Sequence, residues 1–173
     1  FPDSYLIPEG YSPEQILDII STNFNKKLAE SKINSSLSLS DSQALILASI
    51  LEREARTIES KKMVAGVLLN RLKINMPLQV DASVQYARDS LFKTEKYWQP
   101  ISKSDLTLNS PYNTYKNRGL PPSPICNPGL ESLIAAYHPI SSEYLFYITG
   151  NDHQMHYAKT LDEHNTNVAK YLK

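Results

Sequence analysis

The stretch Ala44-Leu-Ile-Leu-Ala-Ser-Ile-Leu51, followed directly by Glu52-Arg53-Glu54, decides how this chain folds. Its eight residues contain a single polar member, Ser49, so a helix built from them is apolar nearly all round. Such a helix is typical of the buried core of a domain rather than of its surface. We expect it to span residues 41–56, which places two carboxylates at the end of a buried segment.

Helix and strand signals continue on both sides of this stretch. Ser12 with Gln15, and Ser40 with Gln43, stand at the spacing of capping boxes. In a capping box, two residues at a helix start each accept, through the side chain, a hydrogen bond from the backbone N–H of the other. Thr160 with Glu163 stands at the same spacing before a last helix. We expect the remaining helices over residues 13–31, 59–74, 81–88 and 127–138, and strands over 144–149 and 155–158. The fold class is therefore α+β, a mostly helical domain with a small C-terminal antiparallel sheet.

The composition excludes several classes of function. Eighteen Lys and Arg balance eighteen Asp and Glu among 173 residues, so no overall positive field attracts nucleic acid. The single cysteine, Cys126, forms no internal disulfide and no Cys-rich zinc site. No apolar run reaches the length of a membrane span, and the five scattered glycines form no phosphate-binding loop.

The segment from Ser110 to Pro128 is the least regular part of the chain. It carries five prolines, each of which fixes φ and removes a backbone donor. A long loop of this kind inside a compact domain is usually functional. Its tyrosines, together with Asn113 and Thr114, offer aromatic faces beside amide and hydroxyl groups, the mixture expected where a sugar ring is held.

Glu52 and Glu54 are the candidate acids. At 100° per residue they project from the helix in different directions, and geometry alone does not choose between them. A carboxyl that is desolvated by apolar neighbours has a raised pKa, as a general acid near neutral pH requires. The alternative is that Glu52 forms an exposed ion pair with Arg56, four residues further along the helix.

Seven short motifs follow one another along the chain: Phe-Pro-Asp-Ser-Tyr (1–5), Leu-Ala-Ser-Ile-Leu-Glu-Arg-Glu (47–54), Asn-Arg-Leu (70–72), Pro-Leu-Gln-Val-Asp (77–81), Ser-Pro-Tyr-Asn-Thr-Tyr (110–115), Gly-Leu-Pro-Pro (119–122) and Asn-Pro-Gly (127–129). Taken together in this order, they resemble the MltG (YceG-like) family of endolytic murein transglycosylases. The resemblance implies that residues 1–173 are the YceG-like catalytic domain, a fragment that lacks an N-terminal transmembrane helix and at least part of a LysM-like region. It also implies a glycan-binding cleft between the helix of Glu52 and the proline-rich loop.

The implied activity is that of a lytic transglycosylase, a carbon–oxygen lyase acting on polysaccharide. Such an enzyme cleaves the MurNAc–GlcNAc bond within nascent peptidoglycan strands during cell wall assembly and leaves 1,6-anhydro-MurNAc ends. The family's catalytic glutamate maps onto Glu52, which would protonate the leaving oxygen and then accept the proton of the C6 hydroxyl of the sugar. One carboxyl suffices for this reaction, and we expect neither a metal nor another cofactor.

Eight further residues are expected to bind the glycan. Two have a competing structural interpretation: Asp81 as a helix N-cap and Arg71 as an ordinary ion-pair partner. The tyrosine-rich loop has one as well, since its side chains could serve only to pack the loop. The expected residues are Glu54, Arg71, Gln79, Asp81, Tyr112, Asn113, Thr114 and Tyr115.

Two histidines near the C-terminus, His153 and His156, have the spacing of metal ligands. Asp152 is the only carboxylate beside them and no cysteine accompanies them, so we predict no metal site. Cys126, between prolines, lacks the context of a nucleophile and is predicted to be a loop residue.

The resemblance also implies a location and partners. It places the protein in the bacterial inner (cytoplasmic) membrane with a single span, the catalytic domain lying on the periplasmic or extracytoplasmic side. The expected partners are peptidoglycan strands and cell-wall synthases, without nucleic acid. Two other functions stay open: a non-catalytic peptidoglycan-binding scaffold, and a hydrolytic muramidase in which Glu54 or Asp81 would supply the second carboxylate.

Overall fold

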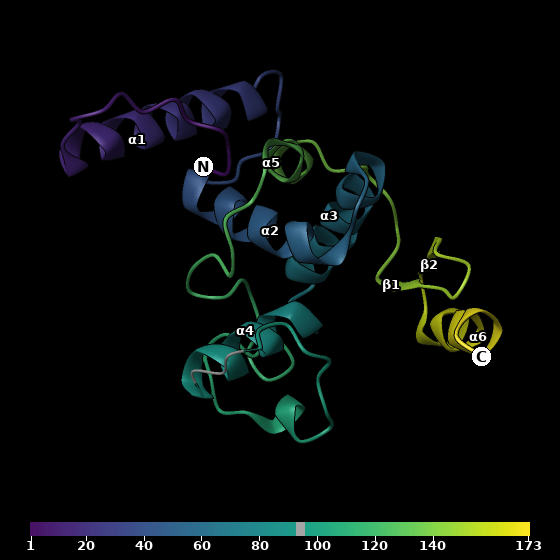
Figure 1. Cartoon of the computed structure of the whole chain (residues 1–173). Coiled ribbons are helices and arrows are strands. Elements are labelled where there is room, and N and C mark those ends of the chain that lie inside the picture. The colour runs from purple at the N-terminus through teal and green to yellow at the C-terminus, as the bar shows by residue number, and fades with distance from the viewer. Residues whose placement is uncertain (93–95) are drawn as a thin grey trace.

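Six α-helices, one short 3-10 helix and one two-stranded antiparallel sheet make up the computed structural model, which describes residues 1–92 and 96–173 (Figure 1). This confirms the α+β class with a small C-terminal sheet. None of the helices in these two ranges has the length and apolar character needed to cross a bilayer. The elements are α1 (Pro13–Ser31), α2 (Asp41–Glu54), α3 (Ile58–Lys73), α4 (Asp81–Phe92), η1 (Asp105–Thr107), α5 (Leu130–Tyr137), β1 (Phe146–Thr149), β2 (Met155–Ala158) and α6 (Leu161–Tyr171).

The helix starts follow their caps. Both expected capping boxes form: Ser12 and Ser40 accept hydrogen bonds from the backbone N–H groups of Gln15 and Gln43, whose side chains bond back to the cap residue. Thr160 caps α6 as expected. A further capping box, at the start of α3, was not identified from the sequence.

The helix α2 ends at Glu54, two residues earlier than expected. Ala55 leaves the helical conformation (φ −143°, ψ 150°), and Thr57 then caps α3 through Ser60. The turn between the two helices is therefore short. It leaves Glu52 and Glu54 in the last turn of α2.

Three other boundaries differ by two or more residues from the expected ones, for local reasons. The helix α4 continues past Arg88 because no proline or glycine interrupts it; the turns expected after it include residues 93–95, which lie outside the described residues. The helix α5 starts only after Gly129, which is its N-cap. The strand β1 begins at Phe146 because two preceding carbonyl groups accept hydrogen bonds from side chains of α3.

The core lies where α2, α3 and α5 pack together. Every residue of α2 from Ile46 to Leu51 is buried, as its apolar composition predicts. On α3, Gly66 leaves room for the backbone carbonyl of Ile140, which an added Cβ would strike. The short helix α5 is buried through Leu133, Ala135 and Ala136.

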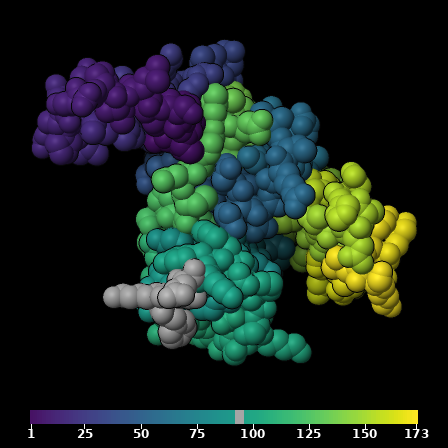
Figure 2. All heavy atoms as spheres, in the orientation of Figure 1, coloured from purple at the N-terminus to yellow at the C-terminus, as the bar shows by residue number. Residues whose placement is uncertain are grey.

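The hairpin of β1 and β2 carries α6 and forms a separate C-terminal lobe, yellow in Figure 1. Tyr147 pairs with Tyr157 in the antiparallel register. Asn70 of α3 joins the lobe to the core by donating to the carbonyl oxygens of Ser142 (2.8 Å) and Tyr144 (3.0 Å). In the space-filling view a notch separates this lobe from the teal region around α4 (Figure 2).

Candidate active site

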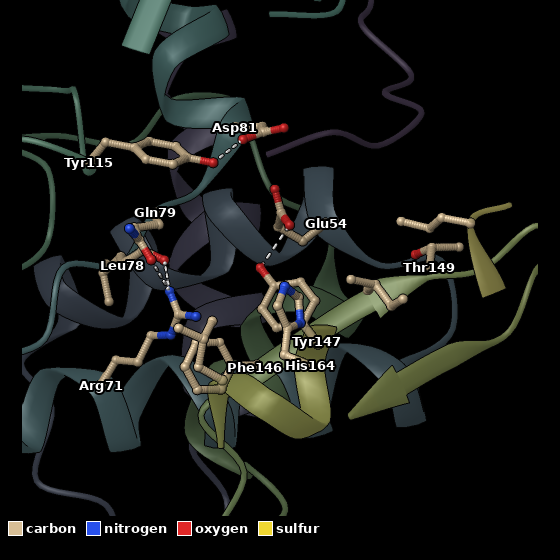
Figure 3. A pocket seen from close by; sticks show the side chains of 13 residues that line it. Glu54, Arg71, Leu78, Gln79, Asp81, Tyr115, Phe146, Tyr147, Thr149 and His164 are labelled. Carbon is tan, nitrogen blue, oxygen red and sulfur yellow. Dashed lines mark hydrogen bonds between the residues drawn. The ribbon is translucent and has the colours of Figure 1, made fainter. Parts of the chain in front are cut away.

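A cavity of ≈ 500 Å³ lies between the C-terminal end of α2, the segment that leads into α4, and the C-terminal lobe (Figure 3). Its lining is polar on the α2 and α4 side and largely apolar on the side of β1 and α6. The lining residues are Glu54, Arg71, Leu78, Gln79, Asp81, Tyr115, Phe146, Tyr147, Ile148, Thr149, Leu161, His164 and Leu172.

Glu54 is the carboxyl group that the end of α2 presents to this cavity. Tyr147 of β1 donates its hydroxyl hydrogen bond to Glu54 Oε2 at 2.7 Å (Figure 3). Burial raises the pKa of Glu54, and the negative charge of Asp81 raises it further; the bonds from Tyr147 and from the backbone N–H of Ala82 act in the opposite direction without cancelling the shift. Glu54 therefore holds a proton to a higher pH than an ordinary glutamate.

Glu52 points away from the cavity, toward the start of α5. Its carboxylate accepts hydrogen bonds from Ser132 Oγ and from the backbone N–H of Gly129 (3.1 Å), and it pairs with Lys61 Nζ at 3.4 Å. Burial opposes the charge of Glu52, but the bonds from Ser132 and Gly129 and the charge of Lys61 outweigh it and lower its pKa. The expectation of a raised pKa for Glu52 is wrong, and its ion-pair partner is Lys61 rather than Arg56.

Asp81 and Tyr115 both line the cavity, and the Tyr115 hydroxyl donates a hydrogen bond to Asp81 Oδ1 (Figure 3). Burial and this bond to an anion raise the pKa of Tyr115, so the phenol keeps its proton. Asp81 is the first residue of α4 itself, and its carboxylate bonds Tyr115. The interpretation of Asp81 as an N-cap is therefore wrong. Asp81 and Tyr115 both line the cavity, and the glycan contacts expected of them stay a prediction.

Arg71 is buried beneath the cavity, with only 6% of its surface exposed. Its Nε donates to the carbonyl oxygen of Leu145 (2.6 Å), and Nη1 donates to that of Leu78 (2.7 Å). No carboxylate within the described ranges forms an ion pair with it, so the ion-pair interpretation is wrong. Gln79, exposed and in the left-handed region (φ 52°), places its side-chain oxygen 3.5 Å from Arg71 Nη1.

Three predicted glycan contacts do not line the cavity. Asn113 is fully buried and donates to the carbonyl oxygens of Leu106 (3.0 Å) and Leu108 (2.9 Å). Thr114, 1% exposed, accepts the backbone N–H of Val80 at 2.9 Å. Both side chains bond backbone groups inside the protein and neither lines the cavity, so the glycan contact expected of them stays a prediction.

Tyr112 also has a packing role. Its ring lies 4.9 Å from that of Tyr86, and its hydroxyl shares a hydrogen bond with Ser123 Oγ. The loop interpretation therefore holds for Tyr112, Asn113 and Thr114, whereas Tyr115 faces the cavity.

No local sequence signal predicted that the C-terminal lobe contributes to the cavity. Phe146 and Tyr147 come from β1, and His164 comes from α6. The strand was expected from its aromatic and β-branched residues, but nothing local indicated that it would stand opposite α2.

The other candidate groups lie outside the cavity. His156 bonds Asp152 (Nε2 to Oδ2, 2.9 Å) and stacks on Tyr171 at 3.5 Å between ring centroids. Cys126 donates from Sγ to the carbonyl oxygen of Ser49 (3.2 Å), and burial raises its pKa to about 11. Residues 1–92 and 96–173 contain no group of three or more His, Cys, Asp or Glu side chains able to hold a metal ion.

Comparison with known proteins finds similarity over nearly the whole chain. The sequence profile of the YceG-like family matches residues 1–170. The chain is 37% identical over 179 residues to a protein of Bacillus subtilis (strain 168) named endolytic murein transglycosylase. It is 31% identical over 175 residues to a protein of the same name from Streptococcus pneumoniae serotype 2 (strain D39 / NCTC 7466).

The fold is similar to that of a solved protein as well. The 2.6 Å crystal structure of a YceG-like protein from Listeria monocytogenes superposes with a TM-score of 0.73 at 36% identity, covering 96% of this chain and 52% of that one. The chain covers 48% of the B. subtilis protein and 31% of the S. pneumoniae protein, with 98% and 99% of its own length aligned. Agreement in profile, sequence and fold across these relatives means that this chain belongs to the YceG-like family.

Proposed function

We propose that this domain is an endolytic lytic transglycosylase that cleaves the MurNAc–GlcNAc bond of nascent peptidoglycan and leaves 1,6-anhydro-MurNAc ends. Relatives that align with nearly all of this chain carry the name endolytic murein transglycosylase. The observation that carries the proposal is the cavity-facing carboxyl of Glu54 with its raised pKa.

The proton donor in this proposal is Glu54 and not Glu52. A general acid must hold its proton near the working pH and must reach the substrate. Glu54 lines the cavity and has a raised pKa, whereas Glu52 is bonded to α5 and Lys61 and has a lowered one. The resemblance that pointed to Glu52 concerns a motif that contains both glutamates, two residues apart.

The reaction runs through one carboxyl group. Glu54 gives its proton to the glycosidic oxygen, and the bond from that oxygen to C1 of the muramic acid breaks. The C6 hydroxyl oxygen of the same sugar forms a new bond to C1, and its proton passes to the Glu54 carboxylate, which restores the acid. The nucleophile belongs to the substrate, so it benefits from a high effective molarity.

The neighbours of Glu54 suit both of its protonation states. Burial and Asp81 favour the acid before proton transfer, whereas Tyr147 and the backbone N–H of Ala82 stabilise the carboxylate after it. Asp81, held by Tyr115, also places negative charge beside the site where positive charge develops on the sugar ring.

Hydrolysis is a second candidate, because the same cavity contains a second carboxylate. A muramidase uses one acid and one carboxylate that acts as nucleophile or activates water. Asp81 lines the cavity close enough for its charge to raise the pKa of Glu54. The two reactions differ in their products, which are anhydro ends for transglycosylation and reducing ends for hydrolysis.

Mass spectrometry of digested peptidoglycan tests the proposal. The purified domain should release fragments with 1,6-anhydro-MurNAc ends, Glu54→Gln should release none, and Glu52→Gln, assayed well below its melting temperature, should keep activity. Reducing ends would establish hydrolysis instead. Binding of glycan without any product would establish the non-catalytic scaffold. An inactive Glu52→Gln together with an active Glu54→Gln would show that Glu52 is the proton donor.

We further propose that the domain works on the outer side of a bacterial cytoplasmic membrane, tethered by a single span and acting beside cell-wall synthases. The support is the substrate, because nascent glycan strands are found there. A topology reporter fused to the full-length protein tests the placement, and a reporter active only in the cytoplasm would contradict it.

A further inference from the structure

His164 faces the cavity from α6, opposite the polar end that holds Glu54 (Figure 3). One face of its ring stacks on Phe146, with ring centroids 5.3 Å apart and an interplanar angle of 29°. Phe146 in turn lies beneath the guanidinium of Arg71, at 5.2 Å. The imidazole is therefore held in place by a column of packed groups rather than by polar contacts.

The ring nitrogens of His164 are unused by the described parts of the protein. No side chain or backbone group within residues 1–92 and 96–173 forms a hydrogen bond with them, although the residue is half-buried. The two carboxyl groups of the cavity are already engaged: Glu54 bonds Tyr147, and Asp81 bonds Tyr115. A side chain that is fixed by packing and keeps its polar atoms free is suited to bind a ligand.

The charge state of His164 suits an uncharged ligand. Burial lowers its pKa, and the positive charge of Arg71 lowers it further, so the ring is neutral at pH 7. A neutral imidazole carries one donor and one acceptor. The hydroxyl and N-acetyl groups of an amino sugar offer complements to both.

We propose that His164 is a glycan-binding residue, whose ring nitrogens hydrogen-bond the polar groups of an N-acetylated sugar in the cavity. This inference rests on the proposed function for its substrate. It assigns the C-terminal lobe a direct part in recognition, so that the sugar lies between Glu54 on one side and α6 on the other.

Kinetics on soluble, uncrosslinked peptidoglycan strands test the assignment. His164→Phe keeps a ring to stack on Phe146 and removes both nitrogens. We expect KM to rise about tenfold, as for the loss of one or two hydrogen bonds to substrate, while kcat changes less than twofold. His164→Gln, which restores a donor and an acceptor, should recover part of the loss. His153→Asn, in an exposed turn with φ 61° that asparagine tolerates, is the matched control and should leave both constants unchanged.

Direct binding separates this inference from the proposed function. In the inactive Glu54→Gln background, calorimetry with a GlcNAc–MurNAc tetrasaccharide should give a Kd about tenfold weaker when His164→Phe is added. An unchanged KM and Kd would overturn the assignment, as would a fall in kcat alone. If the wild-type domain yields no product but the Kd still depends on position 164, the proposed function fails and the binding role stands. Should His164→Phe not fold, His164→Met removes the nitrogens at similar volume and carries the same test.

Discussion

Replacing Glu52 and Glu54 one at a time by glutamine should separate stability from catalysis. The two residues are neighbours in the last turn of α2 and chemically identical, but they meet different surroundings. We expect Glu52→Gln to lower the free energy of unfolding and to keep activity. We expect Glu54→Gln to lose activity and to keep stability.

The expected loss of folding stability in Glu52→Gln follows from the contacts of the Glu52 carboxylate. The carboxylate accepts bonds from Gly129 N–H and Ser132 Oγ and pairs with Lys61, whose side chain is only 7% exposed. A hydrogen bond to a charged group contributes about 1.5–3 kcal/mol, and breaking a buried ion pair costs about 3–5 kcal/mol. Glu52 is 32% exposed and glutamine keeps one acceptor, so we expect a loss of about 2 kcal/mol. For a domain of this size that lowers Tm by about 4–8 °C.

The contributions of Glu52 and Glu54 to the free energy of unfolding should also depend on pH in opposite ways. The folded-state pKa of Glu52 is lowered, so its contribution is present above its ordinary value of 4.5 and is lost as pH falls through the folded-state pKa. The pKa of Glu54 is raised, so the unfolded chain ionises first and stability is lost as pH rises above 4.5. Glu54→Gln should therefore be at least as stable as the wild type at pH 7. The difference in stability between the two proteins should vanish below about pH 4.5.

Thermal unfolding followed by circular dichroism between pH 3 and pH 8 measures all three proteins, and peptidoglycan digestion on the same samples measures activity. The reasoning is refuted if Glu54→Gln is the variant that melts early, or if Glu52→Gln has the wild-type Tm at pH 7.

Three other substitutions test separate features. Gly66→Ala places a methyl group against the carbonyl oxygen of Ile140, and a strain of about 2 kcal/mol should lower Tm by about 4–8 °C. A Tm within 1 °C of the wild type would show that the helix packing relaxes freely. Thr114→Val removes the acceptor of the buried backbone N–H of Val80, just before α4, and should lower the free energy of unfolding in urea by about 1–3 kcal/mol. The folded variant should still bind glycan. Tyr147→Phe removes a hydrogen bond that stabilises the Glu54 carboxylate, so the pKa of Glu54 should rise further. The alkaline limb of the pH profile of kcat/KM should then move to higher pH. A shift to lower pH would contradict this role of Tyr147.

Local signals predicted most of the helix starts. Ser12 and Ser40 form their capping boxes because all partners lie within three residues, which a sequence pattern can specify. The burial of α2 followed from its composition for the same reason. The end of α2 was less predictable, because no proline or glycine marks it and the chain turns only where Thr57 begins the next cap.

The choice between the two glutamates lay beyond any local signal. Glu52 is fixed by Gly129 and Ser132, and Glu54 by Tyr147, all more than 70 positions away in the chain. The role of Asn113 was likewise set by contacts that no local pattern specifies. An amide in a tyrosine-rich loop has the right chemistry for a sugar, but only the folded chain shows that it bonds carbonyl groups instead.

The contacts of Arg71 fix the spacing between the two flanks of the cavity. Its guanidinium joins the carbonyl of Leu78, ahead of α4, to that of Leu145, ahead of β1. One planar side chain thus sets the separation of the two segments that flank the cavity, and under the proposed function that separation limits the thickness of the glycan that fits. Redesign toward bulkier or thinner polysaccharides would begin at position 71, where a lysine, having one nitrogen instead of a fork, would uncouple the flanks and let the gap vary.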